Sequence, residues 1–323
     1  MEFFRYKSPI DFMGKSKIAM TISLILVLSS YVILATKGLN YGIDFAGGTI
    51  VQVKYEKKAP IEAMREKLKA NKLFDNATIT KFGSPNEVII RMKTSTGSVT
   101  NDIGDITRKA LQGTGNYKIR RVDIVGPKVG GELKEKGLMA LLLSVGAILI
   151  YVAFRFEWRF AVASIIALIH DVSISMGAVA LFQIDVNLDV LAAILTLLGY
   201  SLNDTIIVFD RIREGIVKSK NVSLSEIINE SITRTLARTT LTSLTTFFVV
   251  FTLFMFGGEI IHAFAFTLLV GIIVGTYSSI FIASPILMLF GFDVKNYHAK
   301  LAEKAKREAE KERMRAQYES GVM

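Results

Sequence analysis

The 323-residue sequence contains no cysteine and only three histidines. Without cysteine the chain has no disulfide framework, no thiolate chemistry and no cysteine-ligated metal site. The histidines, His170, His262 and His298, are scattered and lack the spacing of metal ligands. Gly47-Gly48 is not followed by the lysine and hydroxyl residue of a phosphate-binding loop. The sequence therefore predicts no enzyme, no metal site and no bound cofactor.

Long apolar runs dominate what is present. The chain is 51% hydrophobic, which is high for an ordinary soluble domain. Six runs have about the 20 residues that cross a bilayer: 18–36, 138–154, 160–182, 188–209, 239–256 and 263–290. No clear small-residue cleavage site follows the first run, so we expect a retained span and not a signal peptide. The sequence predicts an α-helical integral membrane protein with six transmembrane helices.

The net charge of +10 has a particular distribution along the chain. In a soluble protein it would suggest nucleic acid, but here lysine and arginine crowd the ends of alternate apolar runs. These positions are Arg5, Lys7, Lys15, Lys17, Arg155, Arg159, Arg211, Arg213, Lys218, Lys220, Arg234 and eight more from Lys295 to Arg315. The loops 183–187 and 257–262 contain none. Because basic residues stay on the cytoplasmic side, we expect both termini in the cytoplasm and no nucleic-acid partner.

The insertion 37–137 is then predicted to be an extracytoplasmic domain. Strand patterns at 49–55, 77–82, 87–92 and 117–125 alternate with helix patterns at 61–71 and 99–111. The order β-α-β-β-α-β is that of an α+β ferredoxin-like domain. Gly130-Gly131, just before the second span, is expected to form a turn.

Four segments follow from these predictions: 1–36, the cytoplasmic N-terminus with the first span; 37–137, the α+β domain; 138–290, the other five spans; and 291–323, a basic cytoplasmic tail. The tail is rich in alanine, glutamate, lysine and arginine. It is interpreted as a solvated helix, or as a contact with anionic lipid headgroups or a protein partner.

The stretch 188–210 is the centre of the functional prediction because Asn203 and Asp204 lie within it. An aspartate within a span costs at least about 2.5 kcal/mol, so Asp204 requires a partner, a water-filled path or a proton. Arg238 begins the next span. Counted from the outer ends of their helices at the helical rise, Asp204 and Arg238 lie about 24 Å and about 27 Å deep. Two interpretations remain open: a proton site, and a static ion pair that holds the helices together.

The fifth span carries Thr235, Thr239, Thr242 and Thr246 on one helical face. These hydroxyls either bond carbonyl groups one turn earlier or line a hydrated proton path with Asp204.

Three further features of the spans are candidates for a functional or packing role. Asp171, in the third span beside His170, is a second buried acid on the same energetic argument, or a structural hydrogen bond between helices. Gly271 and Gly275 form a small-xxx-small pair that permits close helix approach. Asp210-Arg211 marks the cytoplasmic end of the fourth helix.

Several motifs resemble the SecF family, the smaller membrane subunits of bacterial and archaeal SecD–SecF export complexes. They are GIDFAGGT (42–49), VGPKVG (125–130), IIALIHDV (165–172), GYSLNDTIIVFDRIRE (199–214) and TLARTTLTSLTT (235–246). The resemblance covers nearly the whole chain, except the tail after Lys295.

This resemblance implies a resistance-nodulation-division type of half-bundle in the bacterial cytoplasmic membrane, with SecD supplying the other six spans. It implies that Asp204 and Arg238 are a proton-pathway acid and its basic partner, with protons as the coupling ion. It also implies an accessory role beside SecYEG and SecA, in which the proton-motive force promotes late translocation and release of an exported, unfolded polypeptide.

A proton-coupled exporter of small molecules or lipids is the alternative. It shares the intramembrane charges but usually has both halves in one chain and a ligand cavity. A third possibility is a structural scaffold with a static Asp204–Arg238 pair.

Overall fold

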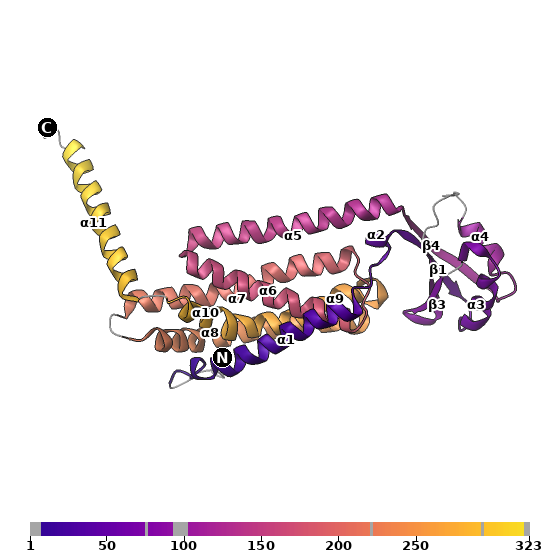
Figure 1. The fold of residues 1–323 in the computed structure, drawn as a ribbon, viewed down its shortest axis with the longest axis horizontal. Coiled ribbons are helices and arrows are strands. Elements are labelled where there is room, and N and C mark those ends of the chain that lie inside the picture. Colours follow the sequence, from indigo (N-terminus) through magenta and orange to yellow (C-terminus); the bar gives the residue numbers. More distant parts are fainter. Residues whose placement is uncertain (1–7, 75–76, 93–102, 220–221, 292–293, 320–323) are drawn as a thin grey trace.

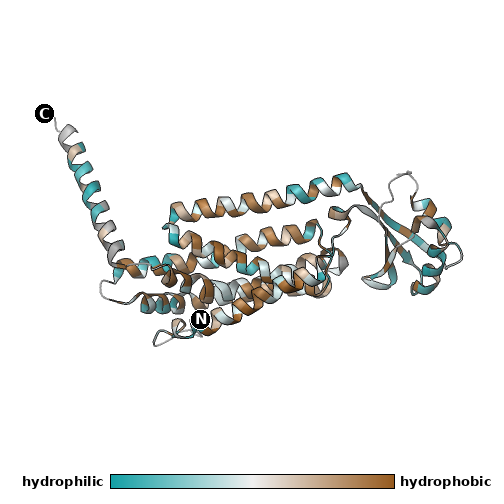
Figure 2. Cartoon of the chain, viewed as in Figure 1, coloured by the Kyte–Doolittle hydropathy of each residue, from teal (hydrophilic) through white to brown (hydrophobic). Residues whose placement is uncertain are grey.

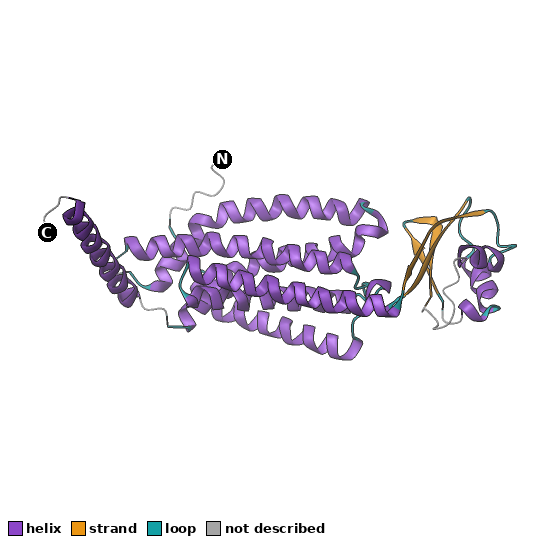
Figure 3. Ribbon diagram, turned by 90° about the horizontal axis from the view of Figure 1, so that it is seen from above, coloured by secondary structure: helices purple, strands orange, loops and turns teal. Residues whose placement is uncertain are grey.

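A computed structural model describes residues 8–74, 77–92, 103–219, 222–291 and 294–319. It consists of a bundle of long helices with a small sheet domain at one end (Figure 1). We call this the sheet end of the bundle and the opposite one the far end. Helix α11 (Val294–Glu319) projects from the far end (Figures 1 and 3).

Six helical segments are long and apolar enough to cross a membrane. They comprise α1 (Ser16–Lys37), α5 (Pro127–Arg155), α6 (Trp158–Leu181), α7 (Leu188–Lys218), α8 (Leu224–Phe256) and α9 (Gly258–Ser278) with its continuation. That continuation is a π-helical turn, Ser279–Ala283, followed by α10 (Ser284–Leu289). Pro285 has no N–H to donate to a preceding carbonyl, which accounts for the irregular hydrogen bonding. The predicted fold class is confirmed.

Helices α6 and α7 form the interior of the bundle. Their membrane segments are 56% and 50% buried, against 11% for α5 and 17% for α1 and α8. The outer helices carry many exposed apolar side chains, such as Phe154 and Phe248. Hydrophobic residues recur along the helices of the bundle (Figure 2). Such a surface is stable beside lipid or a second protein, since water does not solvate it.

Helix α5 differs from its predicted span because it begins at Pro127 and not at 138. The expected turn at Gly130-Gly131 was wrong: both glycines lie in the first turns of this helix. A Cβ atom on Gly130 would lie 3.0 Å from the Gly47 nitrogen. The glycine therefore allows a close approach between α5 and the start of the sheet.

The sheet domain has the predicted order of elements. It contains β1 (Gly48–Tyr55), α3 (Ile61–Lys69), β2 (Thr78–Phe82), β3 (Ser84–Met92), α4 (Ile103–Ala110) and β4 (Tyr117–Val125). The antiparallel strands are arranged β2-β3-β1-β4, and the helices cover one face (Figures 1 and 3). The predicted start of α4, at 99–102, lies outside the described residues.

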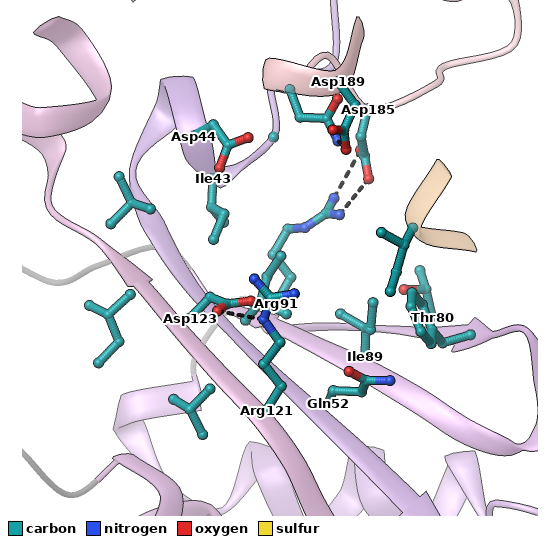
Figure 4. A pocket seen from close by; sticks show the side chains of 18 of the residues that line it. Ile43, Asp44, Gln52, Thr80, Ile89, Arg91, Arg121, Asp123, Asp185 and Asp189 are labelled. Carbon is teal, nitrogen blue, oxygen red and sulfur yellow. Dashed lines mark hydrogen bonds and ion pairs between the residues drawn. The ribbon is translucent and has the colours of Figure 1, made fainter. Parts of the chain in front are cut away.

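The core of this domain follows from strand alternation. Val51 pairs with Ile90 and Val53 with Val88, and all four side chains are fully buried together with Met64 of α3. The opposite face of the sheet points toward the bundle (Figure 4).

The Gly47-Gly48 pair lies where the chain enters the sheet, after a short helix α2 (Ile43–Ala46) that the sequence did not predict. Both glycines have positive φ, 72° and 146°. A Cβ on Gly47 would lie 2.9 Å from the Pro127 Cα, and one on Gly48 would lie 2.7 Å from the Met92 carbonyl oxygen. Only glycine permits this backbone conformation and this packing.

The loop between α6 and α7 fastens the bundle to the sheet domain. Gly42 N–H donates to the Val186 carbonyl (2.8 Å), and Val186 N–H donates to the Asn40 carbonyl (2.7 Å). The turn between α8 and α9 also lies at the sheet end, where Ile260 lines the same cleft as Asp185. The two loops without lysine or arginine therefore share the sheet end.

Candidate functional site

Asp204 lies in the middle of α7 with its side chain 1% exposed. The Ser243 hydroxyl of α8 donates to its Oδ2 atom at 3.3 Å, and the Thr276 hydroxyl of α9 donates to Ser243 Oγ at 2.8 Å. Three helices thus contribute to one polar chain inside an apolar bundle.

Arg238 does not form an ion pair with Asp204, although its positive charge acts on the carboxylate through space. Among the described residues no carboxylate lies within ion-pairing distance of its guanidinium. Asp204 lies at the level of Ser243, to which it is hydrogen-bonded. Ser243 follows Arg238 by five residues on α8, which places it about 7.5 Å closer to the sheet end. The depths of Asp204 and Arg238 therefore differ by about 1.5 helical turns. The structure does not contain the static buried ion pair between them.

The predicted supporting residues are divided between the interior and the surface. Asn203 and Thr242 are exposed, whereas Thr239 is buried. The Thr242 hydroxyl donates to the Arg238 carbonyl at 2.9 Å, and Thr235 and Thr246 likewise bond carbonyls one turn earlier. Only Thr239 in this stripe has a buried hydroxyl without a hydrogen-bond partner among the described residues.

Asp171 is the more completely enclosed acid, with no exposed surface. Its Oδ2 accepts from the hydroxyls of Ser201 on α7 (2.5 Å) and Ser278 on α9 (2.8 Å). Its Oδ1 contacts His170 Nδ1 at 2.9 Å. Gly275 lies beside it, as a Cβ there would be 3.5 Å from Oδ2 and 3.1 Å from the Ser201 Cβ. The small-xxx-small pair is thus at the α7–α9 contact.

The helix-end pair Asp210-Arg211 lies at the far end in a cleft of about 450 Å³. Asp210 accepts from Arg155 of α5 at 3.2 Å, and Arg211 donates to Glu214 at 2.7 Å. Arg238 also lines this cleft. The cleft therefore connects the far end with the level of Arg238.

A second cleft, of about 630 Å³, separates the open face of the sheet from the sheet end of the bundle (Figure 4). Arg91 of β3 reaches across it and forms a two-point ion pair with Asp185 in the α6–α7 loop. On the bundle side, Asp44 Oδ2 accepts from the Leu188 N–H, the first residue of α7, at 3.0 Å. The helix that carries Asp204 is thus bonded at its beginning to the junction of the sheet domain.

Comparison with known proteins assigns this architecture. The profile of the family "Protein export membrane protein SecD/SecF, C-terminal" matches residues 106–293, and that of the "SecD/SecF GG Motif" matches 32–59. The chain is 47% identical over 321 residues to protein translocase subunit SecF of Helicobacter pylori strain J99, covering 99% of both chains. It is 40% identical over 285 residues to SecF of Escherichia coli O157:H7, covering 87% of this chain and 88% of that one.

The chain belongs to the SecF family of protein translocase subunits. A crystal structure of SecDF, a translocon-associated membrane protein from Thermus thermophilus, superimposes with a TM-score of 0.80 at 35% identity. The match covers 88% of this chain but 39% of the SecDF chain. As the sequence predicts, the chain is a membrane protein and a non-catalytic component of protein translocation.

The SecF-family profiles cover the positions described above. The GG-motif match contains Gly47 and Gly48, whose positive φ angles join α2 to β1. The C-terminal match contains Asp171, Asp204 and Arg238.

Sequence reasoning missed the hydroxyl groups around the two acids. Ser243 donates to Asp204 and in turn accepts from Thr276, while Ser201 and Ser278 donate to Asp171. A weak signal existed, because Gly275 is followed by Thr276 and Ser278, hydroxyls next to a residue that allows close packing. The rotation of each helix about its axis decides which acid a hydroxyl contacts, and a single sequence does not reveal that rotation.

Proposed function

We propose that this chain is the SecF half of a bacterial SecD–SecF export complex driven by the proton-motive force. In this proposal SecD supplies the second six-span half, and the complex acts beside SecYEG and SecA. Proton flow promotes the late translocation and release of an exported, unfolded polypeptide, with protons as the coupling ion and no other cofactor. The SecDF chain, of which this chain matches 39%, supports the need for a second half.

The observation that carries the proposal is the environment of Asp204. Its carboxyl group is buried, receives one described hydrogen bond and has a nearby arginine that is not paired with it. Because the Asp204 carboxyl group has a single described hydrogen bond, it can gain or lose a proton with little rearrangement of the neighbouring side chains. One proton crossing the membrane contributes about 2.3 kcal/mol per 100 mV, enough to bias two conformations by tens of fold.

The exposed polar residues near this acid support a protein partner in the membrane. Asn203, Arg238 and Thr242 are exposed on the isolated bundle at or near the depth of Asp204. Lipid solvates such groups poorly, so a second protein covering them is the stable arrangement. SecD is the proposed occupant.

The charge of the loops supports the orientation. At the far end, Arg155 and Arg159 lie on either side of the α5–α6 turn, and Arg211 and Arg213 lie near the end of α7. The short loops 183–187 and 257–262 at the sheet end have no lysine or arginine. We therefore assign the far end and both termini to the cytoplasm, and the sheet domain to the outside of the cytoplasmic membrane.

The test compares Asp204→Asn with Asp210→Asn in membrane vesicles that contain the Sec machinery. Asp210 is a matched acid on the same helix, but it is half exposed and paired with Arg155. Export that depends on the proton gradient should fall at least tenfold in Asp204→Asn and stay within about twofold of wild type in Asp210→Asn. Normal gradient-dependent export in Asp204→Asn, with the protein inserted and assembled, contradicts the proposal.

A further inference from the structure

The proposed function does not use His170, which forms an unusual buried pair with Asp171. The imidazole is 6% exposed and the carboxylate 0%. Nδ1 lies 2.9 Å from Asp171 Oδ1, while the hydroxyls of Ser201 and Ser278 donate to Oδ2. The Nδ1–Oδ1 contact holds one proton, and we assign it to Nδ1 because two hydroxyl donors on Oδ2 favour the ionised carboxylate.

The second ring nitrogen is the informative atom. His170 Nε2 is buried and has no hydrogen-bond partner among the described residues. In a neutral ring with the proton on Nδ1, Nε2 carries a lone pair, and leaving such an acceptor unsatisfied costs about 1–3 kcal/mol. A purely structural role, in which α6 is hydrogen-bonded to α7 and α9, requires Asp171 alone. It does not explain why His170 Nε2 is buried without a hydrogen-bond partner among the described residues.

We propose that His170 and Asp171 form a second proton-binding site in the bundle, with the proton bound at His170 Nε2. Uptake is a simple addition: a hydronium ion gives its proton to the Nε2 lone pair and leaves as water, and the Nδ1–H bond to Asp171 stays. The pair changes from a net charge of −1 to zero. This inference rests on the proposed function for its energy source, because only there does proton binding drive export.

Proton binding at Nε2 also alters the preferred packing. The new N–H has no acceptor in the described arrangement, so the protonated pair favours one in which Nε2 meets water or a hydroxyl. The ring of Tyr277 stacks on His170, with centroids 6.3 Å apart, and its hydroxyl donates to the Ala19 carbonyl of α1 at 2.8 Å. Movement at His170 therefore reaches α1, whereas the described hydrogen bond of Asp204 leads to α8.

The surroundings contain few other titratable groups. On α1 and α9 they are Tyr31, which bonds Ser173 at 3.0 Å, and Tyr277. On α7 they are Tyr200, next to Ser201, and Asp204, about one turn further along. Helix α5 has no titratable residue between Lys136 and Tyr151. Among these groups only His170 carries an imidazole, so a histidine label reports on the pair separately from Asp204.

The test is ¹⁵N NMR of the full chain in lipid nanodiscs with labelled histidine, assigned with His262→Gln and His298→Gln. At about pH 8, His170 should show one tautomer, with Nδ1 protonated and Nε2 bare, and between about pH 8 and about pH 5 Nε2 should reversibly gain a proton. In Asp171→Asn the single tautomer should be lost. A bare Nε2 down to about pH 5 in the wild type overturns the proposal, as does an Asp171→Asn spectrum identical to wild type.

The two proposals fail separately. If Asp204→Asn exports normally while His170 titrates as described, the proton-driven function is wrong and the second proton site stands. If His170 does not titrate while Asp204→Asn loses gradient-dependent export, only the second site is wrong. The wild-type titration needs no variant of the pair, so a folding defect in Asp171→Asn does not obscure the result.

Discussion

At the scale of single residues, two buried acids on neighbouring helices have contrasting surroundings. Asp171 receives three hydrogen bonds, whereas Asp204 receives one, from Ser243. A carboxylate with several well-placed donors is fixed in position and charge, while one with a single donor responds to small helix movements. This contrast favours Asp204 as the group that changes charge on the export cycle.

The Ser243 contact gives a residue-scale prediction. Ser243→Ala removes the one described hydrogen bond to Asp204, a net interaction of about 1 kcal/mol, and should change gradient-driven export about fivefold. Gradient-dependent release of a secreted reporter from vesicles measures this.

Thr252→Ala, on the same helix, is the matched control, because its hydroxyl is exposed and bonds only the Phe248 carbonyl. It should behave as wild type. Equal export in the two variants would show that the Ser243 contact has no part in the function.

At the scale of elements, the α7–α9 contact depends on a glycine. In Gly275→Ala the added methyl would lie 3.1 Å from the Ser201 Cβ, closer than normal packing permits. We expect a loss of about 1–2 kcal/mol in stability, measured as a lower midpoint of thermal unfolding in nanodiscs. Gly199→Ala on α7 serves as the control, since nothing lies within 4 Å of its added Cβ and its midpoint should not fall.

The chain before α1 is fastened to the start of α8 through Asp11 and Asn229. Asp11 accepts from the Gly14 N–H (2.9 Å) and the Asn229 amide (3.0 Å), while Asn229 Oδ1 accepts from the Phe12 and Met13 N–H groups. The Gly14 and Asn229 donors lower the pKa of Asp11 below its ordinary value of 3.8.

This shift predicts a pH dependence with a defined sign. The pKa of Asp11 is lower in the folded chain than in the unfolded chain. Its contribution to folding stability is therefore complete at a pH above the ordinary pKa of 3.8, and it is lost as the pH falls through the lowered pKa. The protection factors of the Phe12 and Met13 amides, which correct the exchange rate for its intrinsic pH dependence, should therefore fall only at acidic pH. Asn229→Ala should lower both protection factors at neutral pH. Unchanged protection in that variant would contradict the proposed link between the N-terminal segment and α8.

At the scale of the whole molecule, the sheet domain and the bundle are joined at a few points. The backbone near Gly47 packs closely against Pro127 at the start of α5, and Asp44 bonds the first residue of α7. The Arg91–Asp185 ion pair holds the open sheet face over the start of α7 (Figures 1 and 4). A displacement of α7 along its axis therefore reaches the sheet domain directly.

The ion pair provides the whole-molecule prediction. Arg91 and Asp185 are 27% and 32% exposed, so their interaction is worth about 1 kcal/mol. In Arg91→Gln the sheet domain should sample more orientations. Spin labels at Lys118→Cys and Thr36→Cys report this as a broader distance distribution, and the chain has no native cysteine to interfere.

Glu87→Gln is the control, because it removes an ion pair with Lys54 that lies wholly within the sheet domain. Its distance distribution should match wild type. A distribution in Arg91→Gln as narrow as in this control would mean that the backbone contacts alone fix the domain.

The sequence alone determined most elements of this protein, apart from the short helix α2 and the first turns of α5. Six spans follow from run length, since the bilayer imposes one thickness on every helix. The succession of strands and helices along the sheet domain follows from period-two alternation, helical spacing and turn residues. Asp204 and Asp171 were found because an acid in an apolar run is costly wherever it lies.

Only the tertiary structure decided how these residues meet. Helix rotation and axial offset place Asp204 against Ser243 and not against Arg238, and place Asn203, one residue away, on the surface. Both depend on side-chain packing between helices that are distant in sequence, and a residue pattern fixes neither. Thus the stretch that draws attention to Asp204 in the sequence is, in the fold, one end of a polar chain through Ser243 to Thr276.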